Sequence, residues 1–337
     1  MENRIQPELP RLKIEGRMKS TNWLSAEQNR AELLQWIAAS SDRYGHAKSL
    51  LGIQAVFAVG VPVVLSLAKL LSPSWGAWAA LYGVLATLFD VLLLDRRQKQ
   101  FLKEGALAQE AFDCAVMQIE WNDERIGEPP AAADKVEWSL AYQAKVPGNS
   151  HHLDWYPTVA GTIPIEYGRL ICLLSSCQWA NRLHKRYAFV LFGSAIALAV
   201  AVVVVSMIVD ARMETLLLTA AAVLPALVWP LRSWKLHTEV LEAVEGQRKR
   251  IERLWLAGLR LEVEQTRLTA GARGIQDDIY SRRKSTQPVF DWIYSRFRRV
   301  DEDAMKAVAA VMVAEYSNSA AYTSTHSHSD GPRNEEQ

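Results

Sequence analysis

The chain has 337 residues, of which 50% are hydrophobic and 22% are charged, and its formal net charge is +1. A charge so close to neutral gives no reason to expect a dedicated binder of nucleic acid polymers. Three cysteines are too few for a disulfide framework, and the polar first 48 residues contain no apolar core of a secretory signal. The apolar residues are concentrated in blocks, which average composition conceals.

Four of these blocks are long enough to cross a membrane. A helix rises about 1.5 Å per residue, so about 20 apolar residues cross a hydrocarbon core of about 30 Å. Only short stretches separate the first block from the second and the third from the fourth. We therefore predict two transmembrane helical hairpins, and the alternative is a set of buried helices in a soluble protein. The predicted spans are residues 49–71, 74–94, 188–209 and 215–234.

Lysine and arginine predict the orientation of these hairpins. Positive residues flank the outer end of every block, whereas the two hairpin tips contain only Lys69 and Arg212. Because positive residues are retained on the cytoplasmic side, both termini and the middle segment are predicted to be cytoplasmic. The three cysteines then lie in a reducing compartment, where we expect free thiols.

The segments outside the spans are predicted to be mainly helical. An amphipathic helix is expected from Ala26 to about Tyr44, with Ser25 as its N-cap. The middle segment begins as a helix and breaks at residues 127–135. A loop rich in proline and glycine follows at 147–168, before a helix that enters the third span.

The C-terminal region continues the helical pattern. Apolar residues recur at spacings near three and four from Val240 to Leu268, which predicts one long amphipathic helix or a coiled-coil seam. The predicted fold class is an all-α membrane protein. Its four transmembrane helices form two hairpins, and its middle and C-terminal segments form a helical cytoplasmic module. The predicted parts are an arm (1–48), hairpins (49–94 and 188–234), a middle segment (95–187), a C-terminal region (235–316) and a disordered tail (317–337).

Catalytic motifs are absent from the sequence. It contains no phosphate-binding glycine loop, no nucleophile elbow and no zinc-ligand spacing. The adjacent His151 and His152 are better explained as part of a polar loop than as a metal site. We therefore predict no enzymatic activity, no catalytic residue, no metal and no cofactor.

Two polar features remain as candidates for function. Asp90 lies near the cytoplasmic end of the second span, where an acid indicates a water-lined path or a paired partner. The alternative is that Asp90 reaches headgroup water. The second feature is a basic cluster that suits a phosphorylated ligand or, alternatively, a patch facing solvent or anionic lipid. This cluster comprises Arg282, Arg283, Lys284, Arg296, Arg298 and Arg299.

Several short motifs keep a fixed order relative to the four spans. They are DRYGHAK (42–48), LDWYP (153–157), CQWAN (177–181) and IQDDIYSRRKSTQPVFDWIYSRFR (275–298). In this arrangement the chain, over roughly residues 20–316, resembles the SMODS-associating four-transmembrane effector family, a family described as pore-forming effectors.

The resemblance implies a role in bacterial anti-phage defence. Members of that family are encoded beside nucleotidyltransferases of the cGAS-like class. By this resemblance a cyclic oligonucleotide second messenger triggers the effector, which breaches the bacterial inner membrane and kills or arrests the infected cell. The expected partners are therefore the cyclic oligonucleotide, the lipid bilayer and further copies of the chain. Four spans with so few polar residues do not enclose an aqueous path in one monomer, so we expect a homo-oligomer.

Two alternative functions stay open at this point. The first is a membrane-anchored signalling or scaffold protein, whose spans only tether the cytoplasmic module. The second is a small transporter, although the two hairpins show no convincing internal repeat. An axial path in an oligomer, faced by Asp90 or by the polar hairpin tip, would distinguish the pore former from the tethered module.

The candidate ligand site combines the loop with the basic cluster. Trp155 and Tyr156 are predicted to stack on a base, a contact worth about 1–3 kcal/mol per base in single-strand binders. The alternative is that both aromatic residues pack in a core and that Asp154 caps the turn. The full set of candidate ligand-binding residues is Asp154, Trp155, Tyr156, Arg282, Arg283, Arg296 and Arg299, and the candidate pore residue is Asp90.

Overall fold

The computed structural model describes residues 22–71, 81–82, 84–86, 88–147, 151–208 and 213–319. The regular structure in these ranges is helical throughout, which confirms the predicted all-α class for this part of the chain. The helices are α1 (Leu24–Glu27), α2 (Ala31–Ala55), α3 (Val61–Leu71), α5 (Asp95–Met117), α6 (Asp123–Ile126), α7 (Ala132–Lys145), α8 (Ile165–Ile208), α9 (Met213–Leu259), α10 (Gln265–Ser285) and α11 (Asp291–Ser317). Two π-helices, η1 (Val56–Gly60) and η2 (Asp90–Leu94), and a 3-10 helix, η3 (Thr158–Thr162), complete the set.

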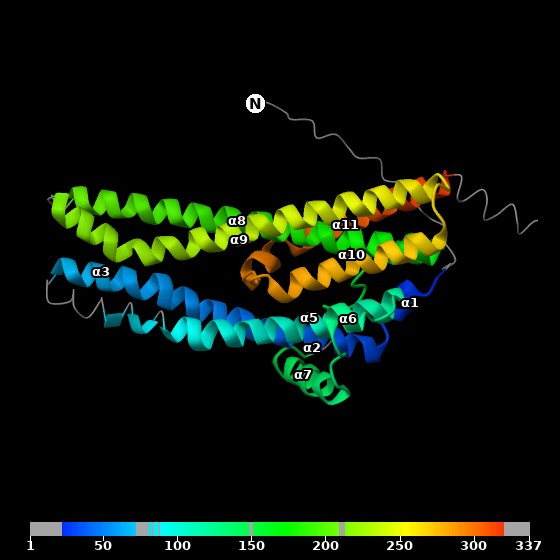
Figure 1. Ribbon diagram of the computed structural model, residues 1–337, viewed down its shortest axis with the longest axis horizontal. Coiled ribbons are helices and arrows are strands. Elements are labelled where there is room, and N and C mark those ends of the chain that lie inside the picture. The colour runs from blue at the N-terminus through cyan, green and yellow to red at the C-terminus, as the bar shows by residue number, and fades with distance from the viewer. Residues whose placement is uncertain are drawn as a thin grey trace, which may run out of the picture.

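Two pairs of long helices run along the length of the molecule (Figure 1). One pair is α8 with α9, and the other is α2, continued by η1 and α3, with η2 and α5. Helix α10 contacts α5, α8 and α9, so it joins the two pairs at one end. At the opposite end the pairs meet directly, because α9 contacts both η1 and α3.

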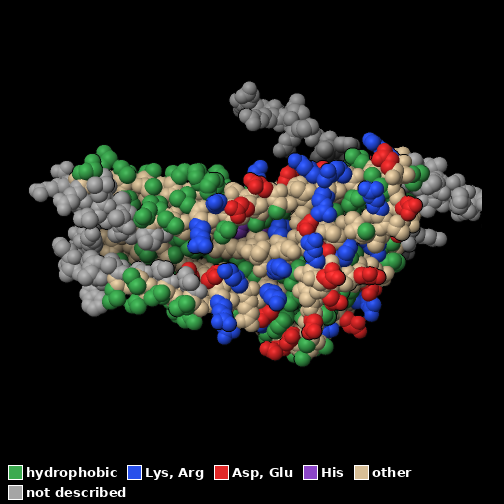
Figure 2. Space-filling model, viewed as in Figure 1, with side chains coloured by type: hydrophobic (Ala, Val, Ile, Leu, Met, Phe, Trp, Pro, Cys, Tyr) green, Lys and Arg blue, Asp and Glu red, His purple; other side chains and the backbone are tan. Residues whose placement is uncertain are grey.

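One end of the molecule is apolar on its surface and the other is charged. Figure 2 shows hydrophobic side chains gathered at the end that α3 and the last part of α8 form, and charged side chains over the rest. Phe189, Met207 and Ile208 on α8 are 76–80% exposed, which is costly in water and suits contact with lipid. The apolar end is therefore the membrane-embedded part.

Two described helices are long and apolar enough to cross a membrane, residues 31–66 and 165–208. They contain much of the first predicted span and nearly all of the third. The described residues of the other two predicted spans are also helical. Both predicted hairpin tips include residues outside the described ranges, so the four-span arrangement stays a prediction.

The main core lies in the charged half and surrounds the first half of α8. Leu170, Ile171 and Leu173 on this helix are at most 1% exposed. The apolar faces of α5, α9, α10 and α11 pack around them because each of these helices is amphipathic. Residues of the same cluster on these helices include Phe112, Met117, Ile251, Trp255, Leu268, Ile275, Ile279, Met312 and Val313.

Two predicted helix boundaries were wrong. The N-terminal helix does not start at Ala26 with Ser25 as its cap, because α1 ends at Glu27 and α2 begins at Ala31 after Arg30. The long C-terminal helix ends at Leu259 rather than running to Leu268, and Leu261 has a left-handed backbone with φ of 59°. The apolar periodicity continues past this turn since α10 folds back and buries its apolar face on α8 and α9.

The 147–168 loop is also more ordered than predicted. It contains η3, and α8 already begins at Ile165. Asn22 holds this segment in place, since its side-chain amide donates hydrogen bonds to the backbone oxygens of Ala160 (2.8 Å) and Ile163 (2.7 Å). The N-terminal arm is thereby fixed to the start of α8.

The contact between η3 and α8 requires a glycine at position 168. A Cβ on Gly168 would lie 2.7 Å from the backbone oxygen of Ala160 and 2.8 Å from Leu24 Cδ1. We expect Gly168→Ala to cost about 1–3 kcal/mol of stability. Gly45→Ala is the matched control, because it meets nothing within 4 Å and lies within α2, so it should stabilise by roughly 0.5–1 kcal/mol. Thermal unfolding in detergent, followed by circular dichroism, measures both, and equal effects would contradict the packing.

Candidate functional site

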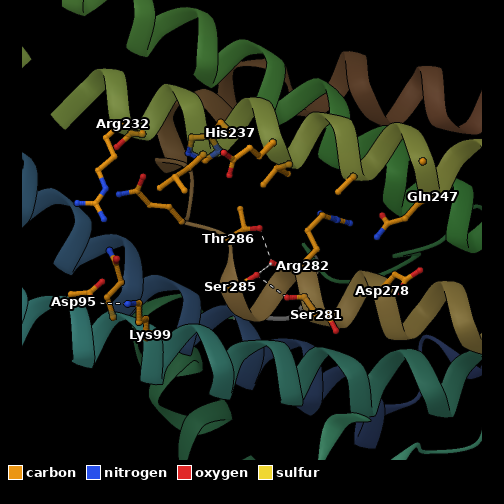
Figure 3. Close-up of a pocket in the computed structure, with 18 of the residues that line it drawn as sticks. Asp95, Lys99, Arg232, His237, Gln247, Asp278, Ser281, Arg282, Ser285 and Thr286 are labelled. Atoms are coloured by element: carbon orange, nitrogen blue, oxygen red, sulfur yellow. Dashed lines mark hydrogen bonds and ion pairs between the residues drawn. The ribbon is translucent and has the colours of Figure 1, made fainter. Parts of the chain in front are cut away.

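A cavity of about 1200 Å³ lies between the two helix pairs. Pockets that hold drug-sized ligands are roughly 300–1000 Å³, so this one has room for a larger ligand. Figure 3 shows α9 on one side of the cavity, the end of α10 opposite it, and Asp95 and Lys99 contributed by α5. The wall also includes Gln54 and Asp90, which lie toward the apolar end, so the cavity reaches the base of the spans.

Arg282 carries a charge on this wall that no described residue compensates. Its guanidinium has no hydrogen bond or ion pair with any described residue, and its Nε atom is buried. Burial lowers the pKa of Arg282 to about 10, which still leaves the group charged at neutral pH. An unpaired cation inside a protein is strongly unfavourable, so the arrangement favours the binding of an anion.

The acids of the wall do not supply the missing charge, because each of the inner ones is held elsewhere. Asp95 accepts a hydrogen bond from Lys99 at 2.7 Å, and Asp278 pairs with Arg250. Asp90 accepts one from the side-chain amide of Gln54 at 2.8 Å. The partner of Asp90, which the sequence left open, is therefore a glutamine from the first predicted span.

Arg283, unlike its neighbour Arg282, has a charged partner. Its guanidinium forms an ion pair with Asp113, a fully buried carboxylate on α5. Asp113 also accepts a hydrogen bond from the Tyr156 hydroxyl at 2.6 Å and one from Gln276 Nε2 at 3.0 Å. The carboxylate beside Arg283 raises the pKa of this arginine above its usual value, against the opposing effect of burial. Arg283 thus has a buried counter-ion and holds α10 on α5.

The aromatic loop residues lie in the core. Tyr156 is 3% exposed and stacks on Phe112 at a ring-centroid distance of 6.3 Å. Trp155 meets the same ring edge-on at 6.4 Å. Asp154 has a φ of 51° and accepts a hydrogen bond from the Asn29 side chain at 2.8 Å. These contacts fix the loop to the arm and to α5.

The structure therefore separates the predicted site residues into two groups. Arg282 and Asp90 line the cavity. The others lie elsewhere, with Arg296 and Arg299 exposed on α11. The predicted stacking of Trp155 and Tyr156 on a base and the pairing of Arg283 with a phosphate receive no support from these positions.

Sequence analysis missed a pair of buried histidines at the cavity. His184 on α8 and His237 on α9 face each other with their Nδ1 atoms 2.8 Å apart. Burial lowers the pKa of His237 to about 4, so this ring is neutral at physiological pH. A signal for the pair was present, since each histidine lies three or four residues beyond the cytoplasmic end of a span in the same predicted hairpin.

These features define a class of protein: an all-helical membrane protein whose charged half encloses a cavity with an unpaired cation. The described residues contain no group of three or more side chains suited to hold a metal ion. Residues 22–312 match the model of the SMODS-associating 4TM effector domain. The match covers most of the chain, which therefore belongs to this family of membrane effectors associated with SMODS-type defence systems. No curated protein and no solved structure matches the chain.

The two neighbouring arginines predict opposite effects on stability. Arg283→Met leaves Asp113 buried without its counter-ion, which should cost about 3–5 kcal/mol. Arg282→Met removes an uncompensated charge and should be neutral or stabilising in the absence of ligand. Chemical unfolding of the two variants in detergent measures the difference. A loss in Arg282→Met as large as that in Arg283→Met would contradict the assignment of Arg282 as unpaired.

The histidine pair predicts a loss of stability in acid. The folded-state pKa of His237, about 4, lies below the ordinary histidine value of 6.5, so its contribution is complete above pH 6.5 and is lost as pH falls toward 4. We expect the unfolding temperature to fall between pH 7 and pH 5. The fall should be smaller in His237→Asn, which cannot titrate, while His152 contributes equally to both proteins. Identical pH profiles would exclude His237 as a cause.

Proposed function

We propose that this effector forms pores and that a cyclic oligonucleotide second messenger triggers it by binding in the cavity. The unpaired guanidinium of Arg282, which lies on the cavity wall with its Nε atom buried, is the observation that carries the proposal. Phosphodiester groups would supply the counter-charge through charge-assisted hydrogen bonds. Association of the family with SMODS-type systems supports a nucleotide as the source of that phosphate.

The position of the cavity provides a route from binding to the membrane. Its wall combines α10, through Arg282, with α5, through Lys99, and with α9, through Arg232. A ligand that contacts all three favours one spacing of the helix pairs over others. Ligand binding shifts a conformational equilibrium by its difference in affinity for the two states. Of these helices, α5 directly follows the second predicted span and α9 contains the fourth, so a change in spacing would reach the membrane.

Two π-helices mark the place where such a change would act. η1 and η2 lie in the first helical hairpin, beside Gln54 and at Asp90. π-helical turns interrupt the regular ladder of helix hydrogen bonds and are frequent at functional sites. One carbonyl of η1, that of Phe57, accepts a hydrogen bond from the Tyr82 hydroxyl at 2.7 Å. We propose that this part of the hairpin rearranges when the effector opens.

The proposed active form is a homo-oligomer in the bacterial inner membrane. Four predicted spans with few polar residues do not line an aqueous path alone, so several copies would have to surround it. Asp90 is the acid that we propose to face this path. Both termini would remain cytoplasmic, where the second messenger is made. The protein would act by binding and rearrangement, without a catalytic step.

Leakage of dye from liposomes tests this proposal. The purified protein is inserted and exposed to a panel of cyclic di- and trinucleotides. We expect one nucleotide to cause leakage, and Arg282→Met to raise the concentration required by about tenfold or more, because a hydrogen bond to a charged group is lost. Arg299→Met is the matched control, since this exposed arginine does not line the cavity and should leave leakage unchanged.

Two outcomes would contradict the proposal. Folded and inserted protein that causes no leakage with any nucleotide would favour a tethered signalling module. Nucleotide-dependent leakage that is equal in the wild type and in Arg282→Met would place the trigger site outside the cavity.

A further inference from the structure

The cavity wall contains neutral polar atoms that lack partners, in addition to Arg282. Three buried atoms, Gln54 Oε1, His237 Nε2 and Gln287 Oε1, have no hydrogen-bond partner among the described residues. His237 is fully buried and Gln54 is 7% exposed, so bulk solvent does not replace the missing bonds. Buried polar groups are normally hydrogen-bonded, which makes a group of orphaned atoms on one wall an indication of a ligand.

We propose that this neutral part of the wall binds a nucleobase while Arg282 binds a phosphate, so that the cavity selects its nucleotide by the base. The inference rests on the proposed function, because it places the nucleotide in the same cavity. It adds an explanation of how the cavity would distinguish one nucleotide from another, which the positive charge of Arg282 alone does not provide.

Hydrogen-bond chemistry separates a nucleotide from other anions. Gln54 donates its amide to Asp90, which orients its oxygen as an acceptor that lacks a donor. Phosphodiester oxygens are acceptors and cannot satisfy it. The amino and imino groups of nucleobases are donors, and their edges present donors and acceptors in a base-specific pattern. A ligand that satisfies both Gln54 and Arg282 therefore carries N–H donors as well as negative charge.

Two contacts hold the ring of His237 in one orientation on the cavity wall. Its Nδ1 is engaged with His184, and its ring also packs edge-on against Tyr187 at a centroid distance of 4.7 Å. The remaining nitrogen, Nε2, donates or accepts according to the tautomer that the histidine pair adopts. A neutral imidazole fixed in this way can read a base edge and adds no charge that would compete for phosphate.

Gln287 places the base-reading part close to the phosphate-binding part. Helix α10 ends at Ser285, and Gln287 follows it by two residues. The Thr286 hydroxyl donates a hydrogen bond of 2.6 Å to the backbone oxygen of Arg282, which fixes the chain between the two side chains. Figure 3 shows Arg282 and Thr286 at this end of the helix, opposite His237 on α9. Phosphate and base contacts thus come from both sides of one cavity.

Calorimetric titration of the full-length protein in detergent tests the inference. The probes are cyclic dinucleotides and trinucleotides of adenine, guanine and uracil, with tripolyphosphate as an anion that has no base. We expect one nucleotide to bind at least tenfold more tightly than tripolyphosphate. Arg282→Met should weaken both kinds of probe. Gln287→Met should weaken the nucleotide by about 3- to 10-fold and leave tripolyphosphate unchanged, because it removes a neutral hydrogen bond.

His237 offers a matched pair of variants. His237→Asn keeps a polar group near the position of Nδ1, so it retains the contact with His184, and it lacks the outer nitrogen. His237→Gln places its amide nearer the position of Nε2. We expect the Asn variant to lose base discrimination and the Gln variant to restore part of it, which a purely structural role of the histidine would not produce.

The results distinguish this inference from the proposed function. Selective binding with the expected pattern, without leakage, would refute pore opening and leave the base-reading wall intact. Leakage by a nucleotide whose affinity and base ranking are unchanged in both Gln287→Met and His237→Asn would refute the base-reading wall alone. Tripolyphosphate binding as tight as that of the best nucleotide would also overturn it, and no binding of any probe would overturn both.

Discussion

The ion pair between Arg283 and Asp113 determines how the charged half of the protein is arranged. It joins α10 to α5 through a fully buried carboxylate that also accepts a hydrogen bond from the Tyr156 hydroxyl. Successive residues on an α-helix point about 100° apart, since one turn contains 3.6 residues. With Arg283 fixed on α5, Arg282 is turned away from that carboxylate and toward the cavity, where no described residue compensates its charge. The same contact that stabilises the fold thus creates the site where an anion is needed.

The cavity lies where the soluble and membrane parts of the chain meet. On its wall, residues that follow or precede the predicted spans, such as Asp95 and Lys99, face the end of α10. The wall residues on α5 and α9 lie next to the second and fourth predicted spans. The paired inner acids, the uncompensated Arg282 and several neutral orphaned atoms give the wall a composition suited to a ligand with both phosphate and base.

Much of the architecture could be predicted because its signals are local. Block length and apolar content predicted the helical spans, and helix-period spacing predicted most of α9. The errors fell at turns, such as the one at Leu261, where the apolar spacing continued although the chain reversed. Among the candidate site residues, Arg282 and Asp90 lie on the cavity wall, whereas Tyr156 and Arg283 lie in a buried network that joins distant segments.

The sequence by itself determined the fold class, the apolar spans, the family and the presence of a basic segment after Ile279. It could not decide between Arg282 and Arg283, which are identical in type and adjacent. That choice depends on Asp113, a residue 170 positions away, and the pairing of His184 with His237 likewise depends on two helices packing together. Hydrophobic periodicity is a local property that can be recognised from neighbouring residues of one helix. Whether a buried charge is compensated depends instead on which distant groups tertiary packing brings within about 3 Å of it.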